Sequence, residues 1–219
     1  MGNVGLLFVG IVLLVNGLNS LGIVPARSAA VLNLFVGSLQ VVLPTIILIQ
    51  NSTDAAVISA TWPTYLFGFT YLYFGLNLLF SLEPQGFGWY SAFVAAIAGY
   101  YALITIQSDP IFAVIWLTWA IMWTLFFLLL ALGQAQLTRF TAWFLILLGV
   151  PTCTISALFL FNGVWSTEPV AGLVALGALV AAAVLSWLLA RSGLARGAAD
   201  ATAEPAAEPQ VSLASPVPA

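Results

Sequence analysis

The chain has 219 residues, of which 63% are hydrophobic and 5% are charged, and its formal net charge is −3. A soluble domain carries about 25% charged residues, so this composition excludes an ordinary water-facing surface. It predicts instead an all-α polytopic membrane protein with no separate soluble domain.

Long charge-free stretches define the predicted transmembrane helices. The internal charges from Arg27 to Arg191 are separated by stretches of 22 to 29 residues without any charge. A helix that spans the hydrocarbon core needs ~20 apolar residues, so each stretch holds one span and a turn. A membrane β-barrel would need shorter strands of alternating polarity. In chain order the predicted spans are 3–22, 28–50, 61–81, 87–107, 110–132, 140–161 and 169–190.

The chain ends and the connections predict the orientation. Residues 3–22 have no positive charge before them, which favours a retained helix over a cleaved signal. Residues 193–219 are rich in Ala, Pro, Glu and Ser and are expected to form a disordered tail. The connections after the first, third and fifth spans and the tail hold Arg27, Arg139, Arg191 and Arg196, together with Glu83. The connections after the second, fourth and sixth spans hold Asp54, Asp109 and Glu168. Because basic residues stay on the cytoplasmic side, the N-terminus is expected outside and the C-terminus inside.

The predicted spans lack the groups on which most membrane chemistry depends. Apart from Cys153 and the tyrosines they contain no titratable side chain, and the chain has no Lys and no His. This excludes a retinal Schiff base, a His-ligated haem and a carboxylate relay for proton coupling. No cluster of metal ligands is visible, so we expect no metal, no cofactor and no enzymatic activity. Any transport is expected to be passive, with an uncharged permeant.

Three spans each carry a narrow apolar face that is largely aromatic. In the fifth span Phe112, Trp116, Trp119 and Trp123 are spaced 4, 3 and 4 residues apart, which places them within a stripe of ~60°. The third span offers Phe69, Tyr73 and Asn77, and the first offers Val9, Leu13 and Asn16. A slot between aromatic faces suits a flat, neutral, polar solute, whereas an ion would lose more hydration energy there.

The same stripes also fit ordinary helix packing, and the residues alone leave both interpretations open. Tryptophan in membrane proteins usually lies near the interfaces, although Trp119 and Trp123 fall in the middle of their span. Asn16, Asn77, Asn33 and Gln40 are more often partners in hydrogen bonds between helices than ligands.

Six segments of the chain resemble the AmiS/UreI family of urea and short-chain amide channels. They are FVGIVLLVNG (8–17), VLNLFVGSL (31–39), FGFTYLY (67–73), WYSAFVA (89–95), IWLTW (115–119) and RFTAW (139–143). The segments follow the family's order through the first six spans, over residues 5–162. The resemblance favours a solute path over simple packing for the aromatic stripes.

The resemblance implies a fold and a set of pore residues. It implies a six-helix channel protomer over 1–165 with its own pore, a ring of six protomers, and a bacterial plasma-membrane location. The implied pore residues are Val9, Leu13, Phe69, Tyr73, Trp116, Trp119, Met122 and Trp123. Membrane lipid, urea or short-chain amides and a cytoplasmic amidase or urease are the expected partners, and nucleic acid is not. The seventh helix, within 166–192, is an addition to this core.

The chain departs from the acid-gated urea channel of this family at several places. Its outer loop near 51–60 is short, and the absence of His rules out acid gating by His. Phe112 replaces a Trp of the fifth span, and Leu148 replaces a pore-side Glu of the sixth. These departures favour the amide-channel branch. A non-transporting membrane scaffold is the alternative hypothesis, and an intramembrane enzyme is the weakest.

Overall fold

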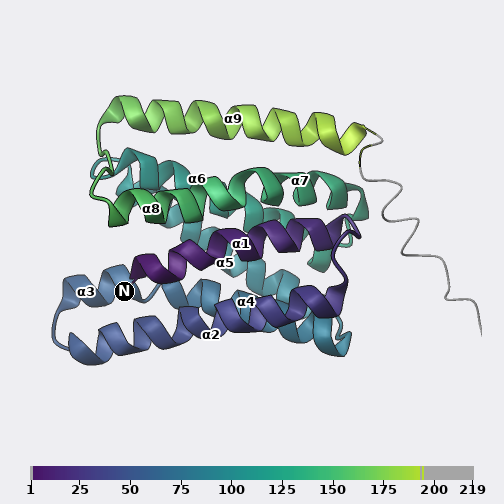
Figure 1. Cartoon of the computed structure of the whole chain (residues 1–219), viewed down its shortest axis with the longest axis horizontal. Coiled ribbons are helices and arrows are strands. Elements are labelled where there is room, and N and C mark those ends of the chain that lie inside the picture. The colour runs from purple at the N-terminus through teal and green to yellow at the C-terminus, as the bar shows by residue number, and fades with distance from the viewer. Residues whose placement is uncertain (1, 193, 195–219) are drawn as a thin grey trace, which may run out of the picture.

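A computed structural model describes residues 2–192 and 194, and this part of the chain is an all-helical bundle without strands. The helices lie roughly side by side along the long axis of the molecule (Figure 1). The α-helices are α1 Gly2–Ser20, α2 Ala26–Gln50, α3 Ala55–Thr61, α4 Thr64–Phe80, α5 Gln85–Thr105, α6 Pro110–Phe126, α7 Thr138–Gly149, α8 Ser156–Phe161 and α9 Pro169–Arg191. Two π-helical segments, η1 Phe127–Ala131 and η3 Val150–Ile155, and one 3₁₀ turn, η2 Ala135–Leu137, complete the fold.

The predicted all-α membrane architecture is confirmed. Among the described residues, six helical runs are long and apolar enough to cross a membrane. The third predicted span, 61–81, is the one outside these six and corresponds to α4, which has 17 residues and stands at the lower end of the ~17–25 that a spanning helix needs. The described helices therefore include six to seven membrane spans. The predicted tail at 193–219 lies outside the described residues, except for Leu194.

The structure adds local detail that the hydropathy pattern did not predict. Part of the predicted loop 51–60 forms α3, whose first turn is capped by Asp54 through its Oδ1, which accepts hydrogen bonds from the backbone N–H groups of Ala56 and Val57. Residues 138–161 form one helical run interrupted by η3, which begins at Val150 and contains Pro151. Proline cannot donate the usual helical hydrogen bond, and a π-helical turn accommodates such a break.

Close contact between small residues joins α2 to α4. A Cβ added at Gly37 would lie 2.8 Å from the backbone nitrogen of Leu72, and one at Gly68 would lie 3.0 Å from the carbonyl oxygen of Gln40. Any side chain at either position would therefore push the two backbones apart. These glycines fix which face of α4 lies against α2 and, with it, which residues of α4 face the centre of the bundle.

A pair of amide side chains joins α1 to α2. Asn16 donates to Oδ1 of Asn33 at 3.0 Å, and Asn33 donates back to Oδ1 of Asn16 at 2.6 Å. Both side chains are buried, so the pair satisfies polar groups that would otherwise be unpaired. It also sets the longitudinal register of α1 against α2.

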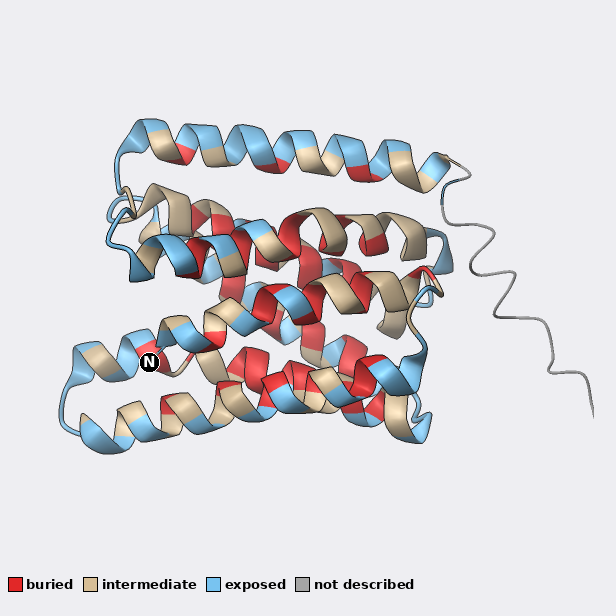
Figure 2. Cartoon of the chain, viewed as in Figure 1, coloured by how far each residue is buried: buried red, intermediate tan, exposed pale blue. Residues whose placement is uncertain are grey.

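Helix α9 lies on the outside of the bundle against α6 and α7 (Figure 1). Most of its surface is exposed (Figure 2), and its buried residues are Gly172, Leu179 and Ser186. Arg139 at the start of α7 holds the end of α9, because its Nε donates to the carbonyl of Ala190 at 3.0 Å and its Nη2 to that of Ser192 at 3.1 Å.

The arginines of the described chain lie at one end of the bundle and three of its four acidic residues at the other, and Glu83, between α4 and α5, is the exception. The starts of α2 and α7 and the end of α9, which carry Arg27, Arg139 and Arg191, lie at the same end (Figure 1). Asp54, Asp109 and Glu168 precede α3, α6 and α9 at the other end. There the indole N–H of Trp165 donates to Oδ2 of Asp109 at 2.8 Å and ties the loop before α9 to α6.

Candidate functional site

The aromatic rings of α6 stack into the centre of the bundle. Trp116 and Trp119 meet edge to face with ring centroids 5.0 Å apart. Phe67 of α4 completes the group, with its centroid 5.0 Å from that of Trp119 and 6.2 Å from that of Trp123. All four side chains are buried. The indole N–H of Trp119 is held by Thr152 of η3, to whose hydroxyl it donates at 3.3 Å.

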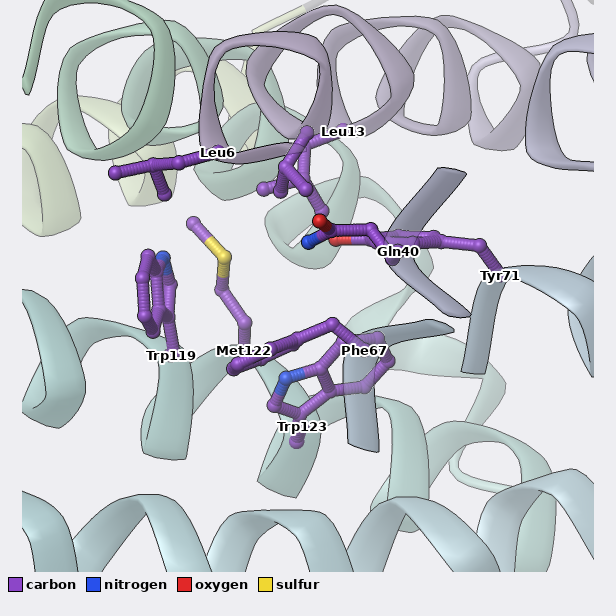
Figure 3. A pocket seen from close by; sticks show the side chains of 9 residues that line it. Leu6, Leu13, Gln40, Phe67, Tyr71, Trp119, Met122 and Trp123 are labelled. Carbon is purple, nitrogen blue, oxygen red and sulfur yellow. The ribbon is translucent and has the colours of Figure 1, made fainter. Parts of the chain in front are cut away.

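A cavity opens beside these rings, between α1, α2, α4 and α6 (Figure 3). We call it the aromatic cavity. Its lining residues are Leu6, Val9, Leu13, Gln40, Phe67, Tyr71, Trp119, Met122 and Trp123. The centre of a water molecule can occupy a volume of about 20 Å³ inside it. This is roughly the room for one water, so a urea or acetamide molecule needs the walls to move.

A second, narrower void continues from the aromatic cavity, and we call it the closed void. It leaves no space for a water molecule, and its lining is Leu13, Asn16, Thr70, Tyr71, Phe74, Phe87, Trp123 and Phe126. Leu13, Tyr71 and Trp123 line both spaces. These three side chains therefore lie where the two voids adjoin, and we call this place the constriction.

The chemistry of the wall suits neutral solutes. Hydrocarbon and ring carbons dominate the lining, and none of the nine side chains of the aromatic cavity carries a charge at neutral pH. An ion would lose its hydration shell here without compensation. A flat neutral molecule can instead contact the ring faces. Within 2–192 and 194, no three His, Cys, Asp or Glu side chains come close enough to hold a metal ion.

Several residues predicted from the sequence meet at this cavity. Val9, Leu13, Trp119, Met122 and Trp123 line it directly. Trp116 adjoins the group from the next turn of α6, where it stacks on Tyr101 with centroids 4.8 Å apart.

The register predicted for the third span differs from the structure by two residues. Phe67 and Tyr71 face the aromatic cavity, whereas Phe69 is 50% exposed and Tyr73 packs edge to face on Phe87, 5.6 Å away. The reason lies in Gly68, which faces α2. Phe67 and Phe69 flank it at about 100° on either side, and only the side of Phe67 meets α6. Both aromatic pairs share the spacing of four, so spacing alone cannot choose between them.

The remaining predicted residues lie elsewhere. Asn16 lines the closed void, but its amide is engaged with Asn33. The side-chain amide of Asn77 is buried without a hydrogen-bond partner and lines neither void. Phe112 packs against Trp165 near the start of α6 with centroids 5.2 Å apart. Leu148 is buried in α7, where its carbonyl accepts a hydrogen bond from the hydroxyl of Thr152.

Four lining residues were not predicted as part of the site: Leu6, Gln40, Phe67 and Tyr71. Leu6 precedes Val9 and Leu13 on one face of α1, at spacings of 3 and 4, so the first-span stripe could have been extended to it. Gln40 is one of several polar residues of the second span, and only the contact between α2 and α4 shows which way it points.

The chain is similar to a known protein family and to several individual proteins. A family model described as AmiS/UreI family transporter matches residues 1–164. The transporter protein AmiS2 of Rhodococcus erythropolis is 53% identical over 192 residues, covering 87% of this chain and 93% of that protein. The acid-activated urea channel of Helicobacter pylori is 33% identical over 190 residues, covering 73% of this chain and 97% of that protein.

A solved structure agrees with the fold. The crystal structure of the urea channel from Helicobacter pylori matches with a TM-score of 0.70 at 34% identity, covering 76% of this chain and all of that one. The family match ends before α9. The alignment with AmiS2 covers 87% of this chain, which is more than residues 1–164 make up. It therefore extends beyond the region that the family model matches.

Proposed function

The chain belongs to the AmiS/UreI family of transporters, and from that premise we propose that it is a passive channel for urea and short-chain amides. The family is one of transporters and not of enzymes. We propose that the solute passes within the protomer, through the aromatic cavity and the closed void. The observation that carries this proposal is an uncharged, ring-walled cavity at the centre of an apolar helical bundle.

The geometry suggests how such a solute would be selected. A planar amide or urea molecule can lie against Phe67, Trp119 and Trp123. Its contacts with these ring faces then replace part of the contact with water that it loses. In the structure the constriction is shut, so passage requires Leu13, Tyr71 and Trp123 to shift. Side-chain rotations between staggered states supply such movement, and each passing solute would be followed by closure.

Finer features extend this proposal. The gathering of Arg27, Arg139 and Arg191 at one end of the bundle supports a cytoplasmic C-terminus and an outer N-terminus. We propose a ring of six protomers, because the resemblance to the family implies it, and a metabolic link to an amide- or urea-hydrolysing enzyme inside the cell. Cross-linking followed by native mass spectrometry tests the ring, and a mass other than six protomers would reject it.

Solute flux into proteoliposomes tests the proposed function. Stopped-flow light scattering after an osmotic step with acetamide or urea should report faster swelling of vesicles that contain the protein than of empty vesicles. Equal rates for both solutes would reject a channel for them. That result would favour the second candidate, a non-transporting scaffold, for which the closed constriction is the supporting observation.

A matched pair of variants tests the proposed route. Phe67→Leu alters a ring on the cavity wall, whereas Phe69→Leu makes the same change two residues away on the exposed side of α4. We expect the first to change the ratio of acetamide to water flux and the second to leave it unchanged. The opposite pattern would place the route on the other face of α4.

A further inference from the structure

We propose that Gln40 is the hydrogen-bonding partner of the permeant's amide group and thereby selects solutes that carry N–H donors. This inference rests on the proposed channel function and adds to it the polar contact of the pathway. Gln40 comes from α2, on which sequence analysis placed no pore residue. Its side chain reaches the aromatic cavity between α1 and α4 (Figure 3).

The first observation is an unpaired polar atom in a side chain that lines the cavity. Gln40 is only 4% exposed, and its Oε1 is buried without a hydrogen-bond partner. Buried polar atoms in folded proteins are nearly always paired, and an exception calls for an explanation such as a missing ligand. Among the described residues, Asn77, Thr141 and Trp143 also bury unpaired polar atoms, but they do not line the aromatic cavity.

The second observation is that both neighbours of Gln40 are adapted to its position. A Cβ added at Gly5 of α1 would overlap Oε1 of Gln40. The amide therefore occupies space that is free only because residue 5 has no side chain. Gly68 of α4 lies against the backbone carbonyl of Gln40 and holds that turn of α2 in place. The side chain is therefore held from two sides with its amide beside the cavity, which is the arrangement of a preorganised contact.

The third observation concerns the chemistry that the amide offers. A glutamine side chain presents a carbonyl acceptor and an NH₂ donor in one plane, the same pattern that urea and carboxamides present. When the walls move to admit it, a solute amide can donate an N–H to Oε1 of Gln40, and this bond replaces a hydrogen bond that the solute loses to water. Among the other lining residues, the indole N–H of Trp119 is already used by Thr152. Tyr71 brings a hydroxyl from the neighbouring helix (Figure 3).

The experiment compares two isomeric solutes in proteoliposomes. Propionamide and N,N-dimethylformamide have the same atoms, but only the former has N–H donors. The variant Gln40→Met keeps a long, unbranched side chain and removes the amide. We expect the channel-mediated flux of propionamide to fall by about three- to tenfold, the size of one lost hydrogen bond, while that of N,N-dimethylformamide changes little. Flux through protein-free vesicles is subtracted for each solute.

Two controls separate selectivity from damage to the fold. Gln50→Met makes the same substitution at the exposed end of α2 and should leave both fluxes unchanged. Gly5→Ala should displace the Gln40 amide and reproduce its selective loss, whereas Gly2→Ala on the same helix has open space around it and should not.

Each outcome has a definite meaning. A selective loss of propionamide flux in Gln40→Met and Gly5→Ala supports the proposal. Equal loss of both solutes in Gln40→Met would overturn it, because the residue would then act only on packing or pore width. Wild-type flux of both solutes in that variant would also overturn it and leave the channel function intact. Absence of amide flux in the wild type would instead reject the proposed function itself.

Discussion

The amide pair between Asn16 and Asn33 offers a sharp test of how the bundle is held together. It comprises two hydrogen bonds, of 3.0 Å and 2.6 Å, between buried side chains of α1 and α2. Replacing one Asn by Leu, which has a similar shape, removes both bonds. Asn33→Leu leaves the Asn16 amide buried without a partner. In Asn16→Leu the Nδ2 of Asn33 still donates to the carbonyl of Ala29 at 2.9 Å, and its Oδ1 is left buried and unpaired. Since α1 supplies Leu13 and α2 supplies Gln40, the pair also aligns two walls of the aromatic cavity.

The magnitude follows from the number of bonds and their surroundings. Hydrogen bonds between membrane helices contribute about 0.6 kcal/mol on average and up to about 1.7 kcal/mol. The two bonds together therefore contribute about 1.2 kcal/mol of coupling, and the orphaned amide raises the cost of either single change to about 1–3 kcal/mol. In the double variant no amide is left unpaired, so its loss of stability should be smaller than the sum of the two single losses.

A double-mutant cycle measures this coupling. The free energy of unfolding is obtained for the wild type, Asn16→Leu, Asn33→Leu and the double variant in mixed micelles of mild detergent and dodecyl sulfate. The intrinsic fluorescence of the eight tryptophans reports unfolding. Strictly additive losses, or single variants as stable as the wild type, would refute the reasoning.

Three further predictions follow from the same geometry. Leu13→Ala should join the aromatic cavity to the closed void, raise osmotic water flux and cost about 2–5 kcal/mol of stability; water flux at or below the wild-type level would contradict the assigned constriction. Amide flux should be the same at pH 6 and pH 8, because the chain has no His to titrate between them, and a steep pH dependence would show another sensor. Arg139→Gln should speed hydrogen exchange at the end of α9, where the guanidinium binds backbone carbonyls, and leave flux unaltered; unchanged exchange would show that these bonds do not hold the helix.

Much of the fold was predictable from the charges. Charges mark the chain's exits from the apolar core, and each charge-free stretch produced a helix or a helical run. The π-helical segments and α3 were not predictable in this way. They depend on local hydrogen bonding, such as the cap at Asp54, which leaves mean hydropathy unchanged.

The site was predictable where one helix face is unambiguous and not where two faces look alike. On α6, Trp119 and Trp123 lie on one face, and no other face of that helix carries aromatic residues at the same depth. Both residues line the cavity. On α4 the pairs beginning at Phe67 and Phe69 have identical spacing, and contact with α2 through Gly68 decides between them. Gln40 lies two helical turns from Asn33 on the second span, but a buried amide there fits hydrogen bonding between helices and solute binding equally well.

The central claim is that the protomer conducts small neutral amides through its uncharged interior. Stopped-flow measurement of urea, acetamide, formamide, glycerol and water fluxes into proteoliposomes, with protein-free vesicles as reference, tests it most directly. The account predicts protein-dependent flux of urea and the two amides that exceeds the increase for glycerol. Rates for urea and both amides that match those of empty vesicles would contradict it.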